Sequence, residues 1–180
     1  NIAGVISDSK EMQTRVDKLG YDVIFNKYFN AGVMLINNRE WRRNNITLSA
    51  LAMINSGKVF RYADQDVLNI LLHGRLQYLD SRFNNKTTLS VYYNAEDKNI
   101  NNTVIMHYVT PNKPWYLIFN ASHFNRYFSQ SPWCNAKRYL APSASEVRLK
   151  SKSLWKNRQY GEAISYYWRY LLMKALKVNF

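Results

Sequence analysis

Runs of apolar residues predict four strands along the chain. The opening run covers residues 2–6, and a longer run at residues 28–37 is continuously apolar from Val33 to Ile36. Shorter runs follow at residues 76–79 and at residues 104–106, the latter rich in β-branched side chains. Continuous apolar runs of this length are typical of buried strands, so we expect residues 28–37 to form the clearest buried strand.

Two segments have the three- and four-residue spacing of apolar side chains that is typical of helices. Residues 39–55 form one and end at a Ser-Gly pair, and residues 64–72 form the other. Asp64 suits the N-cap of the second helix and Asp66 its first turn, where the helix dipole favours carboxylates. Acidic first turns are common, so capping alone is a sufficient explanation for both residues.

A pair of helix-capping signals and a polar stretch predict two more segments. A short helix is expected to begin after Asp8 or Ser9 as N-cap and to stop at Gly20. Residues 84–102 are polar and without periodicity, and we expect them to form a surface loop.

The C-terminal segment predicts a basic amphipathic helix from Gly161 onward. Its basic residues lie beside or opposite a stripe of apolar and aromatic side chains. The stripe consists of Ile164, Tyr167, Trp168, Leu171, Leu172, Ala175 and Val178. Such a helix packs on its own domain or docks on an anionic membrane surface, because Lys, Arg and Trp suit that interface.

Length and composition indicate one domain, or one domain with an appendage. The chain has 180 residues, 47% of them hydrophobic, which is enough for a sizeable core. No apolar run approaches the roughly 18 residues of a membrane span, which predicts a soluble or peripheral protein. Cys134 is the single cysteine, which fits a reducing compartment. The sequence begins inside a strand without Met, so we expect it to be a piece of a longer protein.

The net charge of +13 is concentrated near the C-terminus. Residues 137–180 contain ten Lys or Arg and two Glu, a net charge of +8, which leaves +5 for residues 1–136. This charge attracts anionic surfaces such as lipid headgroups. No nucleic-acid-binding motif accompanies it, so nucleic acid is not an expected partner.

His107 and Lys113 follow the run at residues 104–106, at the point where the predicted strand opens into a loop. Strand ends of this kind often hold ligands in α/β proteins. The imidazole of His107 is a possible metal ligand, and the ammonium of Lys113 suits a phosphate. A packed, hydrogen-bonded histidine is the commoner case, so this stretch alone leaves the choice open.

Asn30, Asp64 and Asp66 are candidates for polar chemistry elsewhere in the chain. Asn30 can donate to and accept from sugar hydroxyls, although a local turn bond explains it equally well. Asp64 and Asp66 are two residues apart on a helix, so their side chains diverge and cannot flank one glycosidic bond. This spacing excludes a glycosidase pair and is weak evidence for an Asp-x-Asp metal site.

Three ordered motifs over almost 90 residues resemble the later half of glycosyltransferase family 8. They are Tyr28–Asn37 with Trp41-Arg42, Asp64–Asn69, and His107-Tyr108 with Pro111–Trp115. The tail, with Ser131-Pro132-Trp133 and the basic helix to Lys177, resembles the extra C-terminal region of that family's bacterial lipopolysaccharide core glucosyl- and galactosyltransferases.

The resemblance implies an α/β fold, the C-terminal part of a GT-A-type nucleotide-sugar transferase followed by a small helical region. Residues 1–120 correspond to the later half of the catalytic domain, and residues 121–180 to the basic C-terminal region. The implied activity is retaining transfer of a hexose from UDP-glucose or UDP-galactose to a lipopolysaccharide core sugar. The implied location is the cytoplasmic face of the bacterial inner membrane, as a peripheral protein on its anionic surface.

The resemblance also assigns roles to residues. His107 matches the histidine ligand of a divalent ion, Mn²⁺ or Mg²⁺, and Lys113 the lysine that contacts the diphosphate. Asn30, Asp64 and Gln65 match positions that line the donor sugar, and Gln65 and Asp64 are the implied catalytic residues. Gln65 lies where a nucleophile or a group that stabilises an oxocarbenium ion is expected, and the resemblance does not decide between these two roles.

The sequence departs from the family pattern in two ways. Thr110 occupies a position that is often Gly in the family, so we expect a hydroxyl contact to the phosphate there. The family's first Asp-x-Asp, which supplies further metal ligands, belongs upstream of residues 1–7 and is absent. We therefore expect this chain to be inactive alone. The alternative function is a non-catalytic module that binds glycolipid or anionic membrane.

Overall fold

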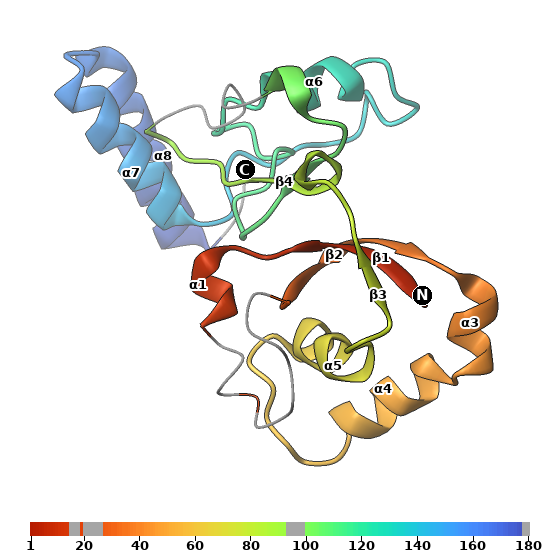
Figure 1. The fold of residues 1–180 in the computed structure, drawn as a ribbon. Coiled ribbons are helices and arrows are strands. Elements are labelled where there is room, and N and C mark those ends of the chain that lie inside the picture. Colours follow the sequence, from red (N-terminus) through yellow and green to blue (C-terminus); the bar gives the residue numbers. More distant parts are fainter. Residues whose placement is uncertain (15–18, 20–26, 93–99, 178–180) are drawn as a thin grey trace. The chain divides into compact units, whose positions relative to one another are not determined.

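The structure, a computed structural model, describes residues 1–14, 19, 27–92 and 100–177. The chain divides into two compact units, residues 1–85 and residues 86–180 (Figure 1). Each unit is described below by itself. The part of the chain that is described contains no helix with both the length and the apolar character of a bilayer-spanning segment.

The first unit is built on a three-stranded sheet in the order β2-β1-β3. Strand β1 (Ala3–Ser7) pairs antiparallel with β2 (Phe29–Ile36) and parallel with β3 (Leu76–Tyr78). The register between β1 and β2 shifts between Gly4 and Ile6, which marks a bulge in the central strand. The three strands occur where the apolar runs predicted them.

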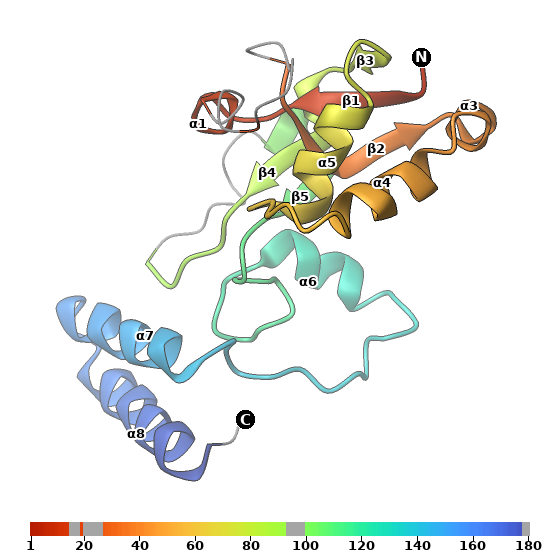
Figure 2. The same cartoon turned by 90° about the horizontal axis from the view of Figure 1, so that it is seen from below.

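Helices cover one face of this sheet. The helices are α4 (Ile46–Ile54) and α5 (Ala63–Leu71), and α5 lies directly on the strands (Figures 1 and 2). The core between them is formed by small and branched side chains of β1 and by large side chains from β2 and the helices. Its fully buried members are Ile2, Ala3, Val5, Phe29, Ile46 and Leu72.

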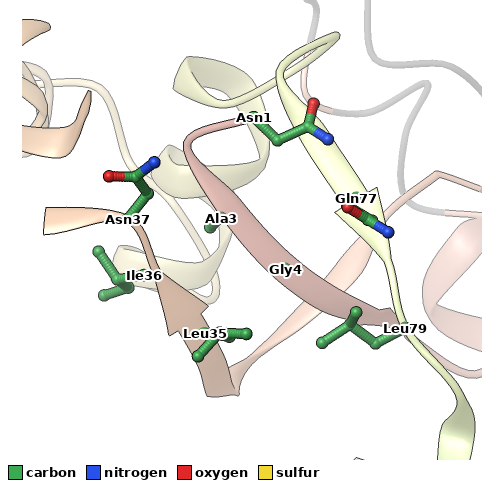
Figure 3. Close-up of a pocket in the computed structure, with 8 residues that line it drawn as sticks. All are labelled: Asn1, Ala3, Gly4, Leu35, Ile36, Asn37, Gln77 and Leu79. Atoms are coloured by element: carbon green, nitrogen blue, oxygen red, sulfur yellow. The ribbon is translucent and has the colours of Figure 1, made fainter. Parts of the chain in front are cut away.

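The other face of the sheet carries an open hollow of about 390 Å³ (Figure 3). Gly4 lies at its centre, and a Cβ atom at this position would come within 2.9 Å of Leu79 Cδ1. Leu35, on this face, is 70% exposed, and Ile36 is also exposed. The prediction that residues 28–37 form the clearest buried strand is therefore wrong, because β2 is buried only at its Phe29 end, whereas β1 is buried along most of its length.

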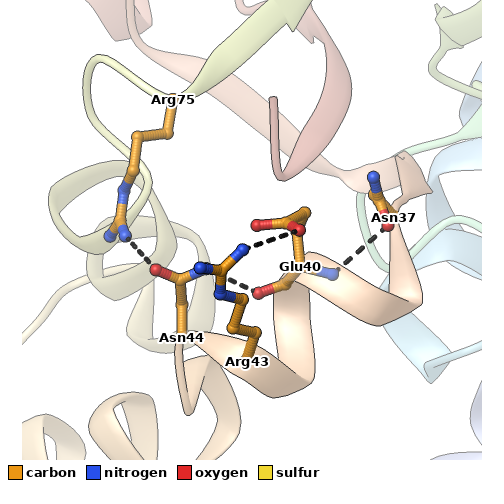
Figure 4. Close-up of polar contacts among 5 residues, drawn as sticks. All are labelled: Asn37, Glu40, Arg43, Asn44 and Arg75. Carbon is orange, nitrogen blue, oxygen red and sulfur yellow. Dashed lines mark hydrogen bonds and ion pairs between the residues drawn. The ribbon is translucent and has the colours of Figure 1, made fainter.

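The predicted helix at residues 39–55 is two helices. The first, α3 (Asn38–Arg43), ends before Asn45, whose left-handed backbone (φ 51°) breaks the helical path before α4 begins. Asn37 caps α3 by accepting from the Glu40 N–H, and Glu40 pairs with Arg43 (Figure 4).

Arg75 connects the end of α3 to the end of α5. Its guanidinium donates to Asn44 Oδ1 at 3.1 Å and to the Leu71 carbonyl (Figure 4). The two helix ends are thus joined by a polar contact, in addition to the apolar core on which Trp41 and Leu68 pack.

A short helix, α1 (Lys10–Gln13), follows β1 as predicted, with Ser9 as its N-cap. The predicted stop at Gly20 lies outside the described residues. Gln13 is buried and bonds both backbone groups of Tyr28, which ties α1 to the start of β2. The unit closes with a 3₁₀ turn, η1 (Ser81–Asn84).

Asn69 of α5 joins that helix to β2. Its side-chain amide accepts from the Phe29 N–H at 2.8 Å and donates to the Phe29 carbonyl at 2.9 Å. It also donates to the Gln65 carbonyl, one turn earlier in α5. Asn69 is fully buried, so it gives Phe29 the hydrogen bonds that a neighbouring strand otherwise supplies.

The second unit begins with a two-stranded sheet of β4 (Asn85–Thr87) and β5 (Met106–Tyr108). The expected surface loop at residues 84–102 is wrong for its first part, because Thr87, Leu89 and Val91 are buried. A short 3₁₀ turn, η2 (Ile100–Asn102), precedes β5. The last predicted strand is also displaced: Val104 and Ile105 are exposed and lie before β5, which contains His107.

Arg138 holds the segment after β5 to α6 (Ser122–Phe128). Its guanidinium donates to the carbonyls of Pro114 and Trp115 and to Asn125 Oδ1, with distances of 2.9 to 3.0 Å. It also lies over the rings of Phe124 and Phe128. Burial lowers the pKa of Arg138, but three acceptors and two aromatic faces keep its charge satisfied.

The C-terminal region is a pair of packed helices, α7 (Ala144–Lys156) and α8 (Tyr160–Leu176). The face of α8 that packs inward carries Ala163, Tyr166, Tyr170 and Met173. The predicted apolar stripe of this helix is therefore largely outside: Ile164, Tyr167, Trp168 and Leu172 are exposed, and Val178 lies outside the described residues. The helix is apolar on both sides, and residue spacing could not tell which side packs.

We expect Asn69→Ala to lower the free energy of unfolding by about 2–4 kcal/mol, because the buried N–H and C=O of Phe29 lose their partner. Urea unfolding followed by far-UV circular dichroism measures the loss. Asn135→Ala, on an exposed asparagine, is the matched control and should change stability little. Equal urea midpoints of unfolding for Asn69→Ala and Asn135→Ala would contradict the proposal that Asn69 docks α5 on β2.

Candidate active site

Gln65, in the first turn of α5, is the centre of a polar cluster in the first unit. Its Oε1 accepts from Asn30 Nδ2 and from the Ala31 N–H, both at 3.1 Å. Its Nε2 donates to Asp8 Oδ2 at 3.1 Å and to the Tyr28 hydroxyl at 3.3 Å. The half-buried amide is thus fixed in orientation by four bonds to other segments of the chain.

Asn30 is the second member of the cluster. Its Nδ2 points to Gln65 and, at 3.5 Å, to Asp8, while its Oδ1 accepts from Asn84 Nδ2 at 3.0 Å and from the Gly32 N–H at 3.1 Å. The turn bond to Gly32 is the local contact that the sequence left as an alternative. The structure contains both this bond and the long-range contacts.

A buried layer lies beneath this cluster. Tyr28 donates its hydroxyl proton to Asp66 Oδ1 at 2.6 Å, and the other carboxylate oxygen accepts from the Tyr62 N–H at 3.0 Å. Asp66 and Tyr28 are both fully buried. Asp66 therefore caps α5 and anchors the tyrosine on which Gln65 rests, and its oxygens are engaged within the fold.

Asp64, by contrast, is exposed in the first turn of α5 rather than at the N-cap, which is Tyr62. As expected from their spacing, Asp64 and Asp66 point to different surroundings. Among the described residues, no group of three or more His, Cys, Asp or Glu side chains is placed to hold a metal ion. The residues that the structure describes therefore do not form a complete metal site.

His107 and Lys113 both lie near the end of β5 in the second unit. His107 is half-buried in the strand, and Lys113 returns from the loop to donate to the carbonyl of Tyr108, the next residue after His107, at 2.6 Å. Asn112 fixes the same loop by donating to the Leu89 carbonyl at 2.9 Å. The loop thus holds a cationic side chain beside the strand end.

Thr110, between His107 and Lys113, has a left-handed backbone with φ 73°. A β-branched residue rarely adopts this conformation, and glycine adopts it readily. The backbone at this position therefore has the geometry of a glycine turn although the residue is Thr. Its side chain is exposed.

The structure brings Asn30 and Gln65 together in the first unit. In the second unit, Lys113 bonds the backbone next to His107. Sequence reasoning missed Asp8, which it treated only as a helix cap. The signal was its position directly after a buried strand, the same argument that selected His107. The hollow in Figure 3 is lined by none of the predicted site residues.

Comparison with known proteins shows the family of the chain. Residues 1–118 match the family described as Glycosyl transferase family 8. The chain is 34% identical to the lipopolysaccharide 1,3-galactosyltransferase of Salmonella typhimurium, an alignment that covers 83% of this chain and 47% of that relative. It is 31% identical to the lipopolysaccharide glucosyltransferase WaaO of Escherichia coli, with 90% and 50% covered. The chain thus spans about half the length of these relatives.

Solved structures show the same fold. The galactosyltransferase LgtC, in complex with donor and acceptor sugar analogs, is 30% identical with a TM-score of 0.54, and the match covers 75% of this chain and 55% of LgtC. The bifunctional glycosyltransferase WbbM is 18% identical with a TM-score of 0.56 over 74% of this chain and 29% of WbbM. These matches confirm the predicted α/β fold of GT-A type with a helical C-terminal region.

We expect Tyr28→Phe to lower the free energy of unfolding by about 1–3 kcal/mol, because Asp66 keeps its buried carboxylate and loses the O–H donor. The phenyl ring and its packing are retained. Chemical unfolding measures the change, with Tyr127→Phe, an exposed tyrosine of α6, as the control. Unchanged stability of Tyr28→Phe would show that the hydroxyl does not hold the layer together.

Proposed function

Because the chain belongs to glycosyl transferase family 8, we propose that the full-length protein transfers a hexose from a UDP-sugar to a lipopolysaccharide core sugar with retention of configuration. The donor is UDP-glucose or UDP-galactose. Support comes from the relatives, which are named as lipopolysaccharide galactosyl- and glucosyltransferases. The chain alone, which spans half of those relatives, is proposed to be inactive.

The observation that carries this proposal is the fixed orientation of Gln65 in its cluster. Asn30, Asp64 and Gln65 are proposed to contact the donor sugar, because amide and carboxylate groups bind hydroxyls in a defined geometry. Asp8, bonded to Gln65 Nε2, is proposed to orient that amide. Another solved structure of LgtC is that of an active-site mutant in which glutamate replaces glutamine, which supports a role for a glutamine in this family.

Gln65 is proposed to stabilise positive charge on the sugar rather than to attack it. Its carbonyl oxygen already accepts two hydrogen bonds, from Asn30 and from the Ala31 N–H, which lowers its nucleophilicity. The carbonyl dipole remains available to an oxocarbenium-like transition state, and its orientation is set before the donor arrives. Asp64, exposed one residue earlier, adds negative charge nearby.

Lys113 and Thr110 are proposed to contact the diphosphate, the first through its ammonium and the second through its hydroxyl. A cation there stabilises the negative charge that develops on the departing UDP. His107 is proposed as the one ligand that this chain contributes to a Mn²⁺ or Mg²⁺ ion. The described residues do not complete such a site, so no step of the transfer is derived through the ion.

Residues 1–120 are proposed to belong to the catalytic domain and residues 121–180 to form a region that docks on membrane. The protein is then peripheral on the cytoplasmic face of the bacterial inner membrane, near its lipid acceptor. The exposed face of α8 supports this role, because Trp168 is 62% exposed beside Arg169 and other cations. A non-catalytic glycolipid- or membrane-binding module is the second candidate function, favoured by the same exposed aromatic side chains.

His107→Ala distinguishes the two candidates. If the full-length protein is a transferase, the variant should lose UDP-sugar turnover by about 10²–10³-fold, because charge stabilisation at the leaving group is lost. Release of UDP in the presence of purified lipopolysaccharide acceptor measures the rate. A binding module predicts that the substitution changes nothing.

His73→Ala, on a half-buried histidine after α5, is the control for loss of a histidine side chain. Thermal unfolding of both variants separates loss of activity from loss of fold. Turnover retained in a folded His107→Ala protein would refute the assigned role.

We expect the double substitution Tyr167→Ser and Trp168→Ser on α8 to weaken binding to anionic vesicles by about tenfold or more. Both side chains are exposed, but the Tyr167 ring also lies 5.8 Å, between centroids, from that of Tyr170, so circular dichroism checks the fold of the variant. Vesicle co-sedimentation measures binding, and Tyr127→Ser is the control on an exposed tyrosine of α6. Equal sedimentation would remove the membrane role of α8.

A further inference from the structure

Helix α4 has an unusual surface for an exposed helix. Residues 44–57, which include the whole of α4, contain no charged residue. Leu48 is 68% exposed and Leu51 is 51% exposed, and Ile54 is exposed as well. Helices that are apolar all round are normally buried, so we expect the exposed face of α4 to contact an apolar partner.

The apolar side chains of α4 divide between two faces. Ile46 is fully buried and packs into the core with Leu72, which fixes the inner face of the helix. Leu48 and Leu51 lie on the opposite side of the helix, and Ile54, at its last residue, lies between the two faces. Val59, five residues after α4, adds a further apolar side chain that is 92% exposed.

Basic residues flank α4 in the sequence. Residues 38–61 contain five Lys or Arg and one Glu, a net charge of +4. Arg42 lies next to the apolar face, since it lines with Trp41, Thr47 and Leu48 a hollow of about 240 Å³. Trp41 is held in place there by donating its indole N–H to the Thr47 hydroxyl at 2.9 Å.

We propose that this α4 face, defined by Leu48, Leu51, Ile54 and Val59 with Arg42 at its edge, docks on an anionic lipid bilayer. Aliphatic side chains enter the boundary between headgroups and acyl chains, and the surrounding cations attract lipid phosphates. The proposal goes beyond the transfer activity and does not depend on it. It places a membrane contact in the first unit, in addition to the one proposed for α8.

Charge favours a bilayer over a second copy of the chain. A two-fold contact would bring the same basic segment, residues 38–61, of each copy close to that of the other, and like charges near one another oppose association. An anionic bilayer neutralises this charge. The apolar face also lacks charged groups that would select a particular protein partner.

A fluorophore attached within the α4 face tests the proposal directly. Cys134 is exposed and is the single cysteine, so Cys134→Ser gives a background without thiols. Leu51→Cys in this background carries an environment-sensitive nitrobenzoxadiazole label, and Gln77→Cys, at an exposed position of β3, is the matched control. The probes are vesicles of phosphatidylglycerol and phosphatidylcholine in equal parts, and vesicles of phosphatidylcholine alone.

The label at position 51 should brighten severalfold and shift to the blue on anionic vesicles only, and the label at position 77 should not. High salt should reduce the effect, because it screens the cations. Absence of a change at position 51 on vesicles that bind the chain would overturn the proposal and leave α8 as the contact. Absence of any vesicle binding would overturn it too.

A second experiment avoids the label. Leu48→Gln with Leu51→Gln should weaken co-sedimentation with anionic vesicles by about tenfold, and Leu48→Met with Leu51→Met should not, because it keeps apolar area. Both positions are exposed, and circular dichroism checks the fold of each variant. A wild-type dimer that the glutamine pair converts to monomer, seen by size exclusion with light scattering, would instead assign the face to a second copy.

Discussion

The side-chain amide of Asn69 is the contact on which the first unit depends. It satisfies both backbone groups of Phe29 in a buried position and so fixes α5 against β2 at one register. Gln65 lies one helical turn before Asn69, and the same amide bonds its carbonyl. The packing contact that docks the helix is therefore also what presents Gln65 to Asn30.

Beneath the polar cluster, the same buried residues stabilise the fold and support Gln65. Asp66 caps α5, holds the Tyr28 hydroxyl and stays buried, while Gln65 above it stays half-buried. A buried carboxylate costs free energy unless it is hydrogen-bonded, so this layer is stable only when its partners are all in place. The result is an amide whose orientation does not have to be set when substrate binds.

The second unit contains a loop with little regular structure, and side-chain contacts must hold this loop in place. Arg138 does so by bonding the carbonyls that follow Lys113 and by stacking on two phenylalanine rings of α6. Helix α8 packs through small and large apolar side chains that alternate with exposed aromatic ones. Helices α4 and α8 thus carry exposed apolar side chains in addition to those that pack in the core. Exposed apolar side chains on a helix are expected where a protein surface binds lipid.

The sequence by itself determined the positions of β1, β2, β3 and α5, because apolar runs and helix signals are local properties of the chain. Strand ends and side-chain chemistry also selected Asn30, His107 and Lys113 as candidates, whereas Gln65 became a candidate only through the motifs of a family and their order. The placement of Asp66 in the first turn of α5 was likewise a local inference and was correct, whereas Asp64 was expected at the N-cap, which is Tyr62.

Only the tertiary structure decided which apolar side chains are inside. It exposed Leu35 and Val104, buried Leu89, broke one predicted helix at Asn45, and turned the predicted stripe of α8 outward. Spacing fixes which residues share a face, but burial depends on what packs against that face, and this is set by residues distant in sequence. The same reason hid Asp8, whose part in the cluster depends on a hydrogen bond to a residue 57 positions away.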